Sequence, residues 1–329
     1  MGWKKLAIRA ESCAIREEAV ERLVIMCLAV LATFAFAWLP PVSLPGIEGG
    51  LRSIGARLNR PIRSDGDRMI RGVLMVVFFG ALGAVLGGIL GNFLERLGAL
   101  GVVVSTVFLA FCMASPARQT LLRHFCESLA KGDEAKATVM AAHLARQNVP
   151  PPDGHAAARI VIAEIARDVE RHFATPLFWF LLAGFPGLGL VCAVSEVDGA
   201  VGINNKAWHS FGSAAANLNT ALRWLPTRIS AFVLALSAVF VDGGKPHAAW
   251  ATAVRYAGRH PSRTGGWPVA AMAGALGVML GRPGASGHGW IGSGALKIGL
   301  AEVRRARRLV FVVRLILAAA CAGLALLVR

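Results

Sequence analysis

The sequence is short of charged residues. Only 16% of its 329 residues are Asp, Glu, Lys or Arg, whereas soluble domains carry about 25%. Apolar residues make up 55%, and the mean hydropathy is +0.57. This composition excludes a disordered chain, a collagen-like repeat and a small disulfide-rich secreted module. It predicts a protein that is embedded largely in lipid.

Paired metal ligands and the common catalytic signatures are also missing. The six cysteines contain no Cys-x-x-Cys pair and the eight histidines show no ligand spacing, so we predict no metal site from these residues. The sequence has no P-loop, no Gly-x-Ser-x-Gly, no His-Glu-x-x-His and no dinucleotide fingerprint. No general motif therefore assigns a reaction.

Acidic residues are scarce as well. Nineteen Asp and Glu stand against 35 Lys and Arg, which gives a net charge of +16. In a soluble protein this surplus would suggest a nucleic-acid partner. In an apolar chain it is typical of cytoplasmic loops and of contact with anionic lipid headgroups. We therefore predict the lipid bilayer as a partner, and no nucleic acid.

Long apolar runs define the fold class. We predict an all-α, polytopic integral membrane helical bundle, forming one domain over residues 1–329, with amphipathic cytoplasmic or interfacial helices. Residues 73–94 and 97–115 are separated only by Glu95-Arg96 and form a hairpin. In 176–195, Gly184-Phe185-Pro186-Gly187 leaves both a kinked span and a re-entrant hairpin open. The predicted spans lie near 23–39, 73–94, 97–115, 176–195, 224–241 and 309–328.

Charge placement orients these spans. An amphipathic helical segment at 118–172 and a cytoplasmic loop with a short helix at 242–308 lie between them. The loop 40–72 holds six Arg and the segment 118–171 holds eight Lys or Arg, so the positive-inside rule places both in the cytoplasm and the Glu95-Arg96 tip outside. The N-terminus carries five positive residues, yet one span before a cytoplasmic loop would place it outside.

Three segments hold polar residues against this apolar background, at 160–180, 198–228 and 259–268. Each has a simple alternative: a solvated helix face, an interfacial helix with a Trp anchor, or a loop with an interfacial Trp. In the third segment, a turn that opens onto a short apolar helix would place backbone N–H groups beside Arg259, His260 and Arg263. That arrangement is a candidate anion site.

Several short motifs then occur in one order along the chain. They are Pro176-Leu177-Phe178, Val197-Asp198 with Gly202, Phe211-Gly212, Leu225-Pro226-Thr227-Arg228, His260-Pro261-Ser262, and Gly266-Trp267-Pro268 followed by Ala270 to Gly277. In this order they resemble the CobD/CbiB family, the adenosylcobinamide-phosphate synthases of cobalamin (vitamin B12) biosynthesis, which are integral membrane proteins. The resemblance covers about residues 160–283.

The resemblance implies a ligase of the bacterial cytoplasmic (inner) membrane. Its reaction joins an aminopropanol (phosphate) group to adenosylcobyric acid by an amide bond, with ATP and magnesium as cofactors. A corrinoid substrate and other cobalamin-pathway proteins are the implied partners. Because ATP must enter from the cytoplasm, this activity favours the re-entrant alternative at 176–195.

The sequence departs from the family pattern at acidic and amide positions. Arg167, Asp168 and Arg171 stand where the family carries Glu, Asn and Asp before Pro-Leu-Phe. Arg in place of a metal-binding carboxylate would exclude magnesium, which prefers oxygen ligands. Further departures are Ala163, Glu164, His172, Asn219, Thr220, Arg223, Thr264 and Val269.

The residues that remain as candidates are few. We predict Asp198 and His260 as catalytic residues, and Arg228, Ser262, Asn205 and Asp168 as substrate- or phosphate-binding residues. Two interpretations stay open: a divergent enzyme of this family, or a catalytically degenerate paralogue that acts as a membrane scaffold or regulator. A transporter is a third, weaker alternative, suggested by Arg314 within a span.

Overall fold

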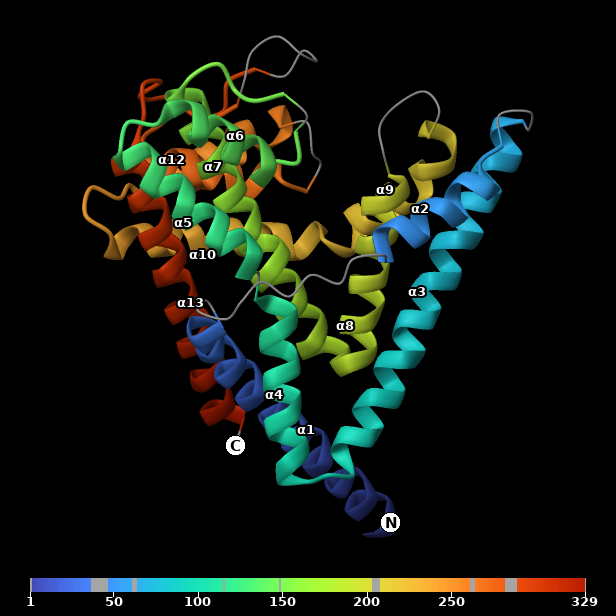
Figure 1. The fold of residues 1–329 in the computed structure, drawn as a ribbon. Coiled ribbons are helices and arrows are strands. Elements are labelled where there is room, and N and C mark those ends of the chain that lie inside the picture. Colours follow the sequence, from blue (N-terminus) through green and yellow to red (C-terminus); the bar gives the residue numbers. More distant parts are fainter. Residues whose placement is uncertain are drawn as a thin grey trace.

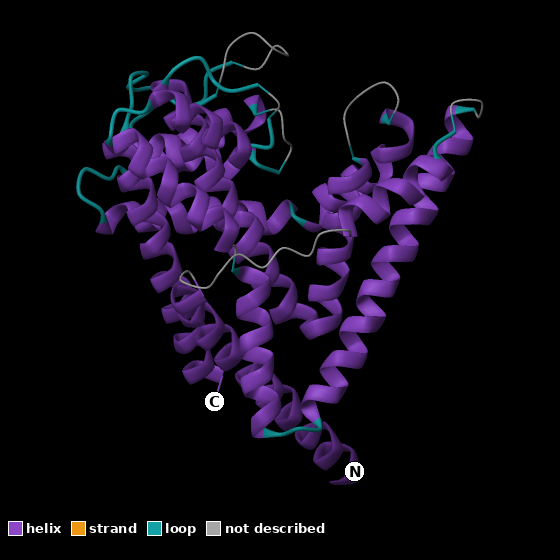
Figure 2. Ribbon diagram, viewed as in Figure 1, coloured by secondary structure: helices purple, strands orange, loops and turns teal. Residues whose placement is uncertain are grey.

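The chain is almost wholly helical in a computed structural model (Figure 1). The structure describes residues 2–36, 47–60, 64–114, 116–147, 149–202, 208–260, 264–281 and 289–328. Within these ranges there is no strand (Figure 2), only two isolated bridges, Val278 with Ala295 and Leu280 with Ile291. The predicted all-α fold is confirmed.

By length and composition, three of the described helical stretches are long and apolar enough to cross a membrane, namely 65–95, 154–201, which contains a reversal at Gly184, and 300–328. The number rises to five if two bent helix pairs each count as one span. These pairs are α4 (Ala99–Met113) with α5 (Pro116–Ala130), bent by 45°, and α9 (His209–Leu222) with the helix 224–240, bent by 48°. The chain is therefore an integral membrane protein.

The predicted hairpin consists of α3 (Asp65–Glu95) and α4. Ser64 caps α3 by accepting a hydrogen bond from the Asp67 N–H, and the chain turns back at Gly98, where φ is +55°. α1 (Gly2–Phe36) includes most of the predicted span 23–39, whose last three residues lie outside the described ranges. α1 begins at the same end of the molecule as the hairpin tip, opposite the large helical lobe (Figure 1).

α8 (Thr175–Val201) reverses direction in its middle. Gly184 has φ +57° and ψ −144°, a conformation that is open to glycine and not to residues with a Cβ. Pro186 begins the second arm, where its missing N–H costs no hydrogen bond. The two arms run in opposite directions (Figure 1), so Thr175 and Val201 lie at the same end of the molecule. Of the two alternatives for 176–195, the structure has the hairpin.

The second arm of α8 packs closely along α3. A Cβ built on Gly83 would lie 2.4 Å from the Gly189 carbonyl oxygen, and one on Gly87 would lie 2.2 Å from that of Phe185. Such backbone contact needs glycine, and small residues serve this purpose in membrane helices. α2 (Ile47–Leu58) and α9 complete this packing unit at its upper end (Figure 1).

A helical lobe covers one end of the bundle (Figure 1). Its apolar core contains Phe125, Ile162, Leu234 and Met272, which are fully buried and come from four different helices. The lobe accounts for the predicted amphipathic segment 118–172 and the predicted short helix within 242–308. Its elements are α5, α6 (Glu134–Leu144), α7 (Gly154–Asp168), α10 (Trp224–Ser237), the 3-10 turns Ala238–Phe240 and Ala257–Arg259, α11 (Pro246–Tyr256), α12 (Gly266–Leu276) and the first half of α13 (Leu300–Val328).

The predicted span at 224–241 corresponds to α10 and the turn that follows it. With 14 residues, α10 is about 21 Å long and does not cross a hydrocarbon core of about 30 Å by itself. It qualifies as a span only together with α9. A separate span there stays a prediction.

Candidate functional site

α7 and the π-helix that follows it carry two buried carboxylates, Glu164 and Glu170. α7 starts where Asp153 accepts a hydrogen bond from the Ala156 N–H at 2.6 Å, and it buries Val161, Ile162 and Ile165 in the lobe core. The π-helix Val169–Ala174 then joins α7 to α8. Because a π-helix holds extra residues per turn, it shifts the direction of the following side chains, and such segments are frequent at functional sites.

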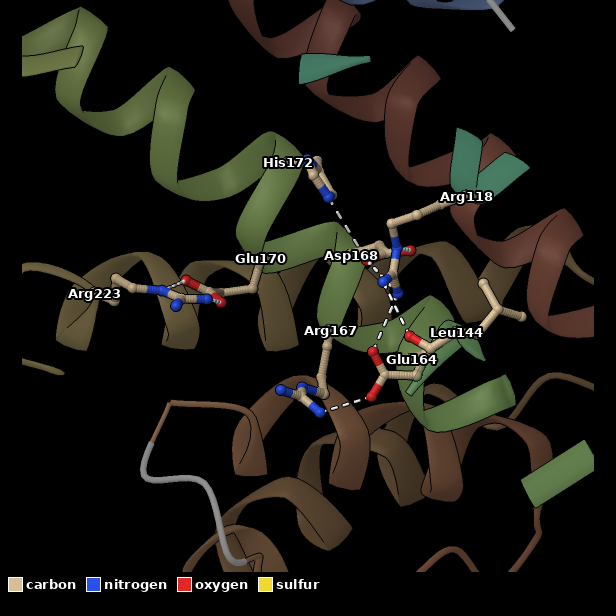
Figure 3. Close-up of polar contacts among 8 residues, drawn as sticks. All are labelled: Arg118, Leu144, Glu164, Arg167, Asp168, Glu170, His172 and Arg223. Atoms are coloured by element: carbon tan, nitrogen blue, oxygen red, sulfur yellow. Dashed lines mark hydrogen bonds and ion pairs between the residues drawn. The ribbon is translucent and has the colours of Figure 1, made fainter. Parts of the chain in front are cut away.

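Arg118 binds the carboxylates of α7. Its Nη2 lies 3.1 Å from Glu164 Oε2, its Nε donates to Asp168 Oδ2 at 3.2 Å, and its Nη1 donates to the Leu144 carbonyl at 3.1 Å. Arg167 Nη1 donates to the other Glu164 oxygen at 2.6 Å. Both carboxylates are therefore neutralised by arginine (Figure 3).

Glu170 points to the other side of the same helix, away from Asp168 and His172 (Figure 3). Its Oε1 accepts from Arg223 Nε at 2.7 Å and from the Thr175 hydroxyl at 2.6 Å, and its Oε2 pairs with Arg223 Nη2. The Glu170 side chain is 1% exposed and that of Arg223 is 9% exposed. Arg223, one of the positions at which the sequence departs from the family pattern, thus lies in a buried ion pair.

Asp198 lies on the second arm of α8, next to this pair. Its Oδ2 accepts a hydrogen bond from Asn219 Nδ2 at 2.6 Å, and the side-chain oxygen of Asn219, Oδ1, accepts one from the Ser195 hydroxyl at 3.2 Å. The Arg223 N–H donates to the Asn219 backbone carbonyl, so Asn219 and Arg223 lie one helical turn apart. Among the described contacts, the direct partner of Asp198 is an amide, whereas those of Glu164, Asp168 and Glu170 include arginines.

Arg228 lies on α10 and His260 lies in the turn before α12, and both are close to the start of α12. The Arg228 guanidinium lies 3.7 Å from the Trp224 ring centroid and 4.9 Å from that of Trp267. A Cβ built on Gly265 would lie 3.2 Å from His260 Cε1 and 3.3 Å from Arg167 Nε. The segments around 167, 198, 223, 228 and 260, far apart in the sequence, therefore come together at one place in the fold.

The predicted site residues divide into three groups. Asp198, Arg228 and His260 lie in this convergent region, although none of the described contacts joins them directly to one another. Asp168 lies on the opposite side of the helix, with Arg118 and His172. Ser262 and Asn205 fall outside the described residues. Their roles in substrate binding stay predictions.

The donor set does not fit a magnesium ion. Magnesium requires free carboxylate or carbonyl oxygens, whereas Glu164, Asp168 and Glu170 are held by arginines. Within the described part of the chain, no group of three or more His, Cys, Asp or Glu side chains could hold a metal. The neighbouring Arg167 and Arg171 instead suit anionic oxygens, because guanidinium groups bind phosphate and carboxylate with two parallel hydrogen bonds. The use of ATP and magnesium stays a prediction.

Sequence reasoning missed the partners in this network. Arg118 counted only as a positive charge of its segment, and nothing in the sequence pairs it with Asp168, 50 residues away. The pairing of Glu170 with Arg223 had one usable signal: Arg223 is the one charged residue of the stretch 210–227, and buried charges occur in pairs. That signal indicates a partner without saying which one.

Comparison with known proteins agrees with the order of motifs. The family model for "CobD/Cbib protein" matches residues 16–310. A cobalamin biosynthesis protein CobD from Sinorhizobium sp. is 28% identical over 69% of this chain and 71% of its own length. One from Rhizobium meliloti is 30% identical over 65% of each chain, and one from Dehalococcoides mccartyi is 31% identical over 65% of this chain and 70% of its own.

The family match extends well beyond the motif region. It includes α1, the α3–α4 hairpin and the lobe, and therefore most of the described fold. The alignments to the curated relatives span about two thirds of each relative. No solved structure matches the chain. Since the family model covers nearly the whole sequence, the chain belongs to the CobD/CbiB family of cobalamin biosynthesis.

Proposed function

We propose that the protein catalyses its family's amide-forming step in the cytoplasmic membrane, joining an aminopropanol (phosphate) group to a corrinoid carboxylate, as an adenosylcobinamide-phosphate synthase. The observation that supports this is the convergence of the motif segments. Asp198 accepts a hydrogen bond from Asn219, and Arg223, one helical turn after Asn219, pairs with Glu170. Arg228 on α10 lies over Trp267, and the His260 and Arg167 side chains both lie beside Gly265, two residues before Trp267.

Each group has a role that its chemistry allows. Amide formation from a carboxylate requires that one carboxylate oxygen leave, and in the predicted ATP-dependent reaction it leaves as part of phosphate. It also requires that the attacking amine lose a proton, and Asp198 or His260 is suited to accept that proton. Arg167 and Arg171 lie within electrostatic range of each other and suit a carboxylate or phosphate of the substrate. Arg228 lies over two indole rings, which hold its guanidinium in a fixed orientation. The re-entrant α8 keeps Asp198 at the same end as the lobe, where substrates from the cytoplasm arrive in the predicted orientation.

A second function has its own supporting observation. The carboxylates of α7 and the π-helix are engaged by arginines, as expected of a site that has exchanged catalysis for structural stability. In that case the protein is a scaffold or regulator for the cobalamin-pathway enzymes.

Complementation separates the two functions. We expect this gene to restore growth of a bacterial strain lacking cobinamide synthesis when adenosylcobyric acid is supplied without cobinamide. Asp198→Asn and His260→Ala should each lower the rate of product formation about 100-fold or more, the range typical of a lost acid–base group. Arg255→Gln, which removes an exposed charge of α11, is the matched control and should keep full activity.

Absence of growth, with normal amounts of the protein in the membrane, would contradict the ligase and support the scaffold. Measuring product formation with and without ATP and magnesium in the same membranes tests the cofactor prediction directly.

A further inference from the structure

A cavity of about 530 Å³ lies on the other side of α7 from the convergent region. It is enclosed by α5, α7, the π-helix and α13, with the ends of α1 and α4 at its base. Asp198, Arg228 and His260 do not line it. The function proposed above gives this cavity no role.

Arginines dominate its lining. α13 contributes Arg304, Arg307, Arg308 and Arg314. Arg307 and Arg308 follow Arg304 by three and four residues, and Arg314 follows Arg307 by seven, so the four lie along one side of the helix. α5 adds Arg118 and Arg123, so that six arginines face the cavity against two carboxylates, Glu164 and Asp168. Arg118 already binds both carboxylates. The α13 arginines therefore give the cavity a positive charge that these acids do not balance.

One buried nitrogen atom at the cavity, Arg314 Nε, has no hydrogen-bond partner in the part of the chain that the structure describes. His172 Nε2 makes no hydrogen bond there either, but it lies 3.8 Å from Asp168 Oδ1. Asp168 Oδ1 also lacks a hydrogen bond, but it lies 3.1 Å from Arg118 Nη2. Buried polar atoms are nearly always satisfied in native proteins. An unsatisfied guanidinium N–H in a positively charged cavity indicates that an anionic ligand completes the site.

The base of the cavity is apolar and aromatic. The Arg314 guanidinium lies 5.4 Å from the Phe34 ring centroid and 4.8 Å from that of Phe173. Met113 and Phe311 also contribute to the lining, and Phe311 is 53% exposed on the outside of α13. The cavity thus passes from arginines at its mouth to apolar side chains that continue onto the membrane-facing helices. A soluble anion would need only the first part, whereas an anionic amphiphile uses both.

We propose that this cavity binds the headgroup of an anionic phospholipid. The phosphate group lies among the α13 arginines, which bind phosphate through paired hydrogen bonds, and the acyl chains follow Phe34 and Phe311 along α1 and α13. Basic pockets between membrane helices at the cytoplasmic side recognise such headgroups. The lipid would tie the lobe to the bundle at the point where α1, α5 and α13 meet.

Native mass spectrometry of the full-length protein tests this site. The purified protein is titrated with phosphatidylglycerol or, for comparison, with phosphatidylcholine. The variant is Arg304→Gln/Arg308→Gln, because both side chains are exposed at the mouth and their removal leaves the core intact. The matched control is Arg52→Gln/Arg57→Gln, which removes the same charge from an exposed surface of α2 outside the cavity.

We expect the wild type to bind phosphatidylglycerol about tenfold or more tightly than phosphatidylcholine, and the Arg304/Arg308 variant to lose most of that preference while the control keeps it. An equal loss in the control would overturn the proposal, because it would indicate general surface attraction. A third arm uses inorganic phosphate with the protein in phosphatidylcholine nanodiscs. If phosphate alone raises the unfolding temperature as much as phosphatidylglycerol does, the cavity binds a soluble phosphate compound and the lipid proposal is wrong.

Discussion

At the scale of single residues, the pairing of Glu170 with Arg223 decides how the charges near α8 are tolerated. Moving either ion from water into a nearly closed site is costly, and the cost is offset only when the partner and further hydrogen bonds are in place. Thr175 supplies such a bond to Glu170. An arginine at position 223 is therefore compatible with this fold because a glutamate lies opposite it.

The pair makes a specific prediction about stability. Arg223→Leu should destabilise the protein by about 3–5 kcal/mol, because Glu170 is left buried without its partner. The double variant Arg223→Leu/Glu170→Leu should recover most of that loss, because it removes both buried charges. The measurement is the free energy of unfolding in detergent, from the denaturant concentration at which helicity is half lost.

Glu18→Gln is the control for this experiment. Glu18 pairs with Arg22, but its side chain is 53% exposed, so its removal should change stability by about 0–1 kcal/mol. If the double variant is no more stable than Arg223→Leu, the loss of stability comes from the packing around the pair and not from the unpaired charge of Glu170.

The sequence identified which residues of this region were unusual but not how they interact. Glu164, Arg167, Glu170 and Arg171 are visible as charges leading into an apolar run. Their partners lie on α5 and at the start of α10, and the π-helix decides which side of the helix each faces. Both depend on tertiary packing, which local patterns do not encode.

At the scale of elements, glycines set the distance between α3 and α8. Gly83 lies against the α8 backbone, whereas a Cβ on Gly88 would meet only Pro186 Cγ, at 3.7 Å, an ordinary contact. The two positions lie on one helix and differ mainly in the space available for a side chain. They therefore form a matched pair for substitution.

Gly83→Ala should destabilise the protein by roughly 1–3 kcal/mol, because the added methyl group forces α3 and α8 apart. Gly88→Ala should be neutral or stabilising by up to about 1 kcal/mol, because alanine is the better helix former and has room. Thermal unfolding of the two purified variants against the wild type measures the difference. Equal stability of the two variants would contradict the close packing of α3 on α8.

The helices also show which parts of the fold can be predicted from sequence patterns. The α3–α4 hairpin was predicted within a few residues of its apolar core, since two long apolar runs with a charged tip allow few alternatives. The sequence does not decide whether α8 kinks or reverses, because Pro186 and Gly184 permit both a kink and a turn. Contact with α3 through Gly83 and Gly87, a tertiary feature, selects the turn.

At the scale of the whole molecule, the structure separates the charged segments. The lobe and the start of α3 lie at one end, and the Glu95-Arg96 tip lies at the other with the beginning of α1 (Figure 1). The positive-inside rule still predicts that the lobe end faces the cytoplasm, because the segment 118–171 with its eight Lys or Arg lies there. The N-terminus, with its five positive residues, then lies at the outer end and is an exception to that rule.

Cysteine labelling tests this orientation and the α8 hairpin together. In a background without native cysteines, three single variants, Lys131→Cys in the lobe, Ala99→Cys at the hairpin tip and Gly199→Cys at the end of α8, all place the thiol at exposed positions. In intact cells an impermeant maleimide should label only Ala99→Cys, and it should label the other two after the membrane is opened. Gly199 is the decisive position, because a single span through 176–201 would place it outside with Ala99, whereas the reversal at Gly184 returns it to the side of Lys131. Labelling of Gly199→Cys in intact cells would contradict the hairpin, and with it the access of Asp198 to cytoplasmic substrates on which the proposed reaction depends.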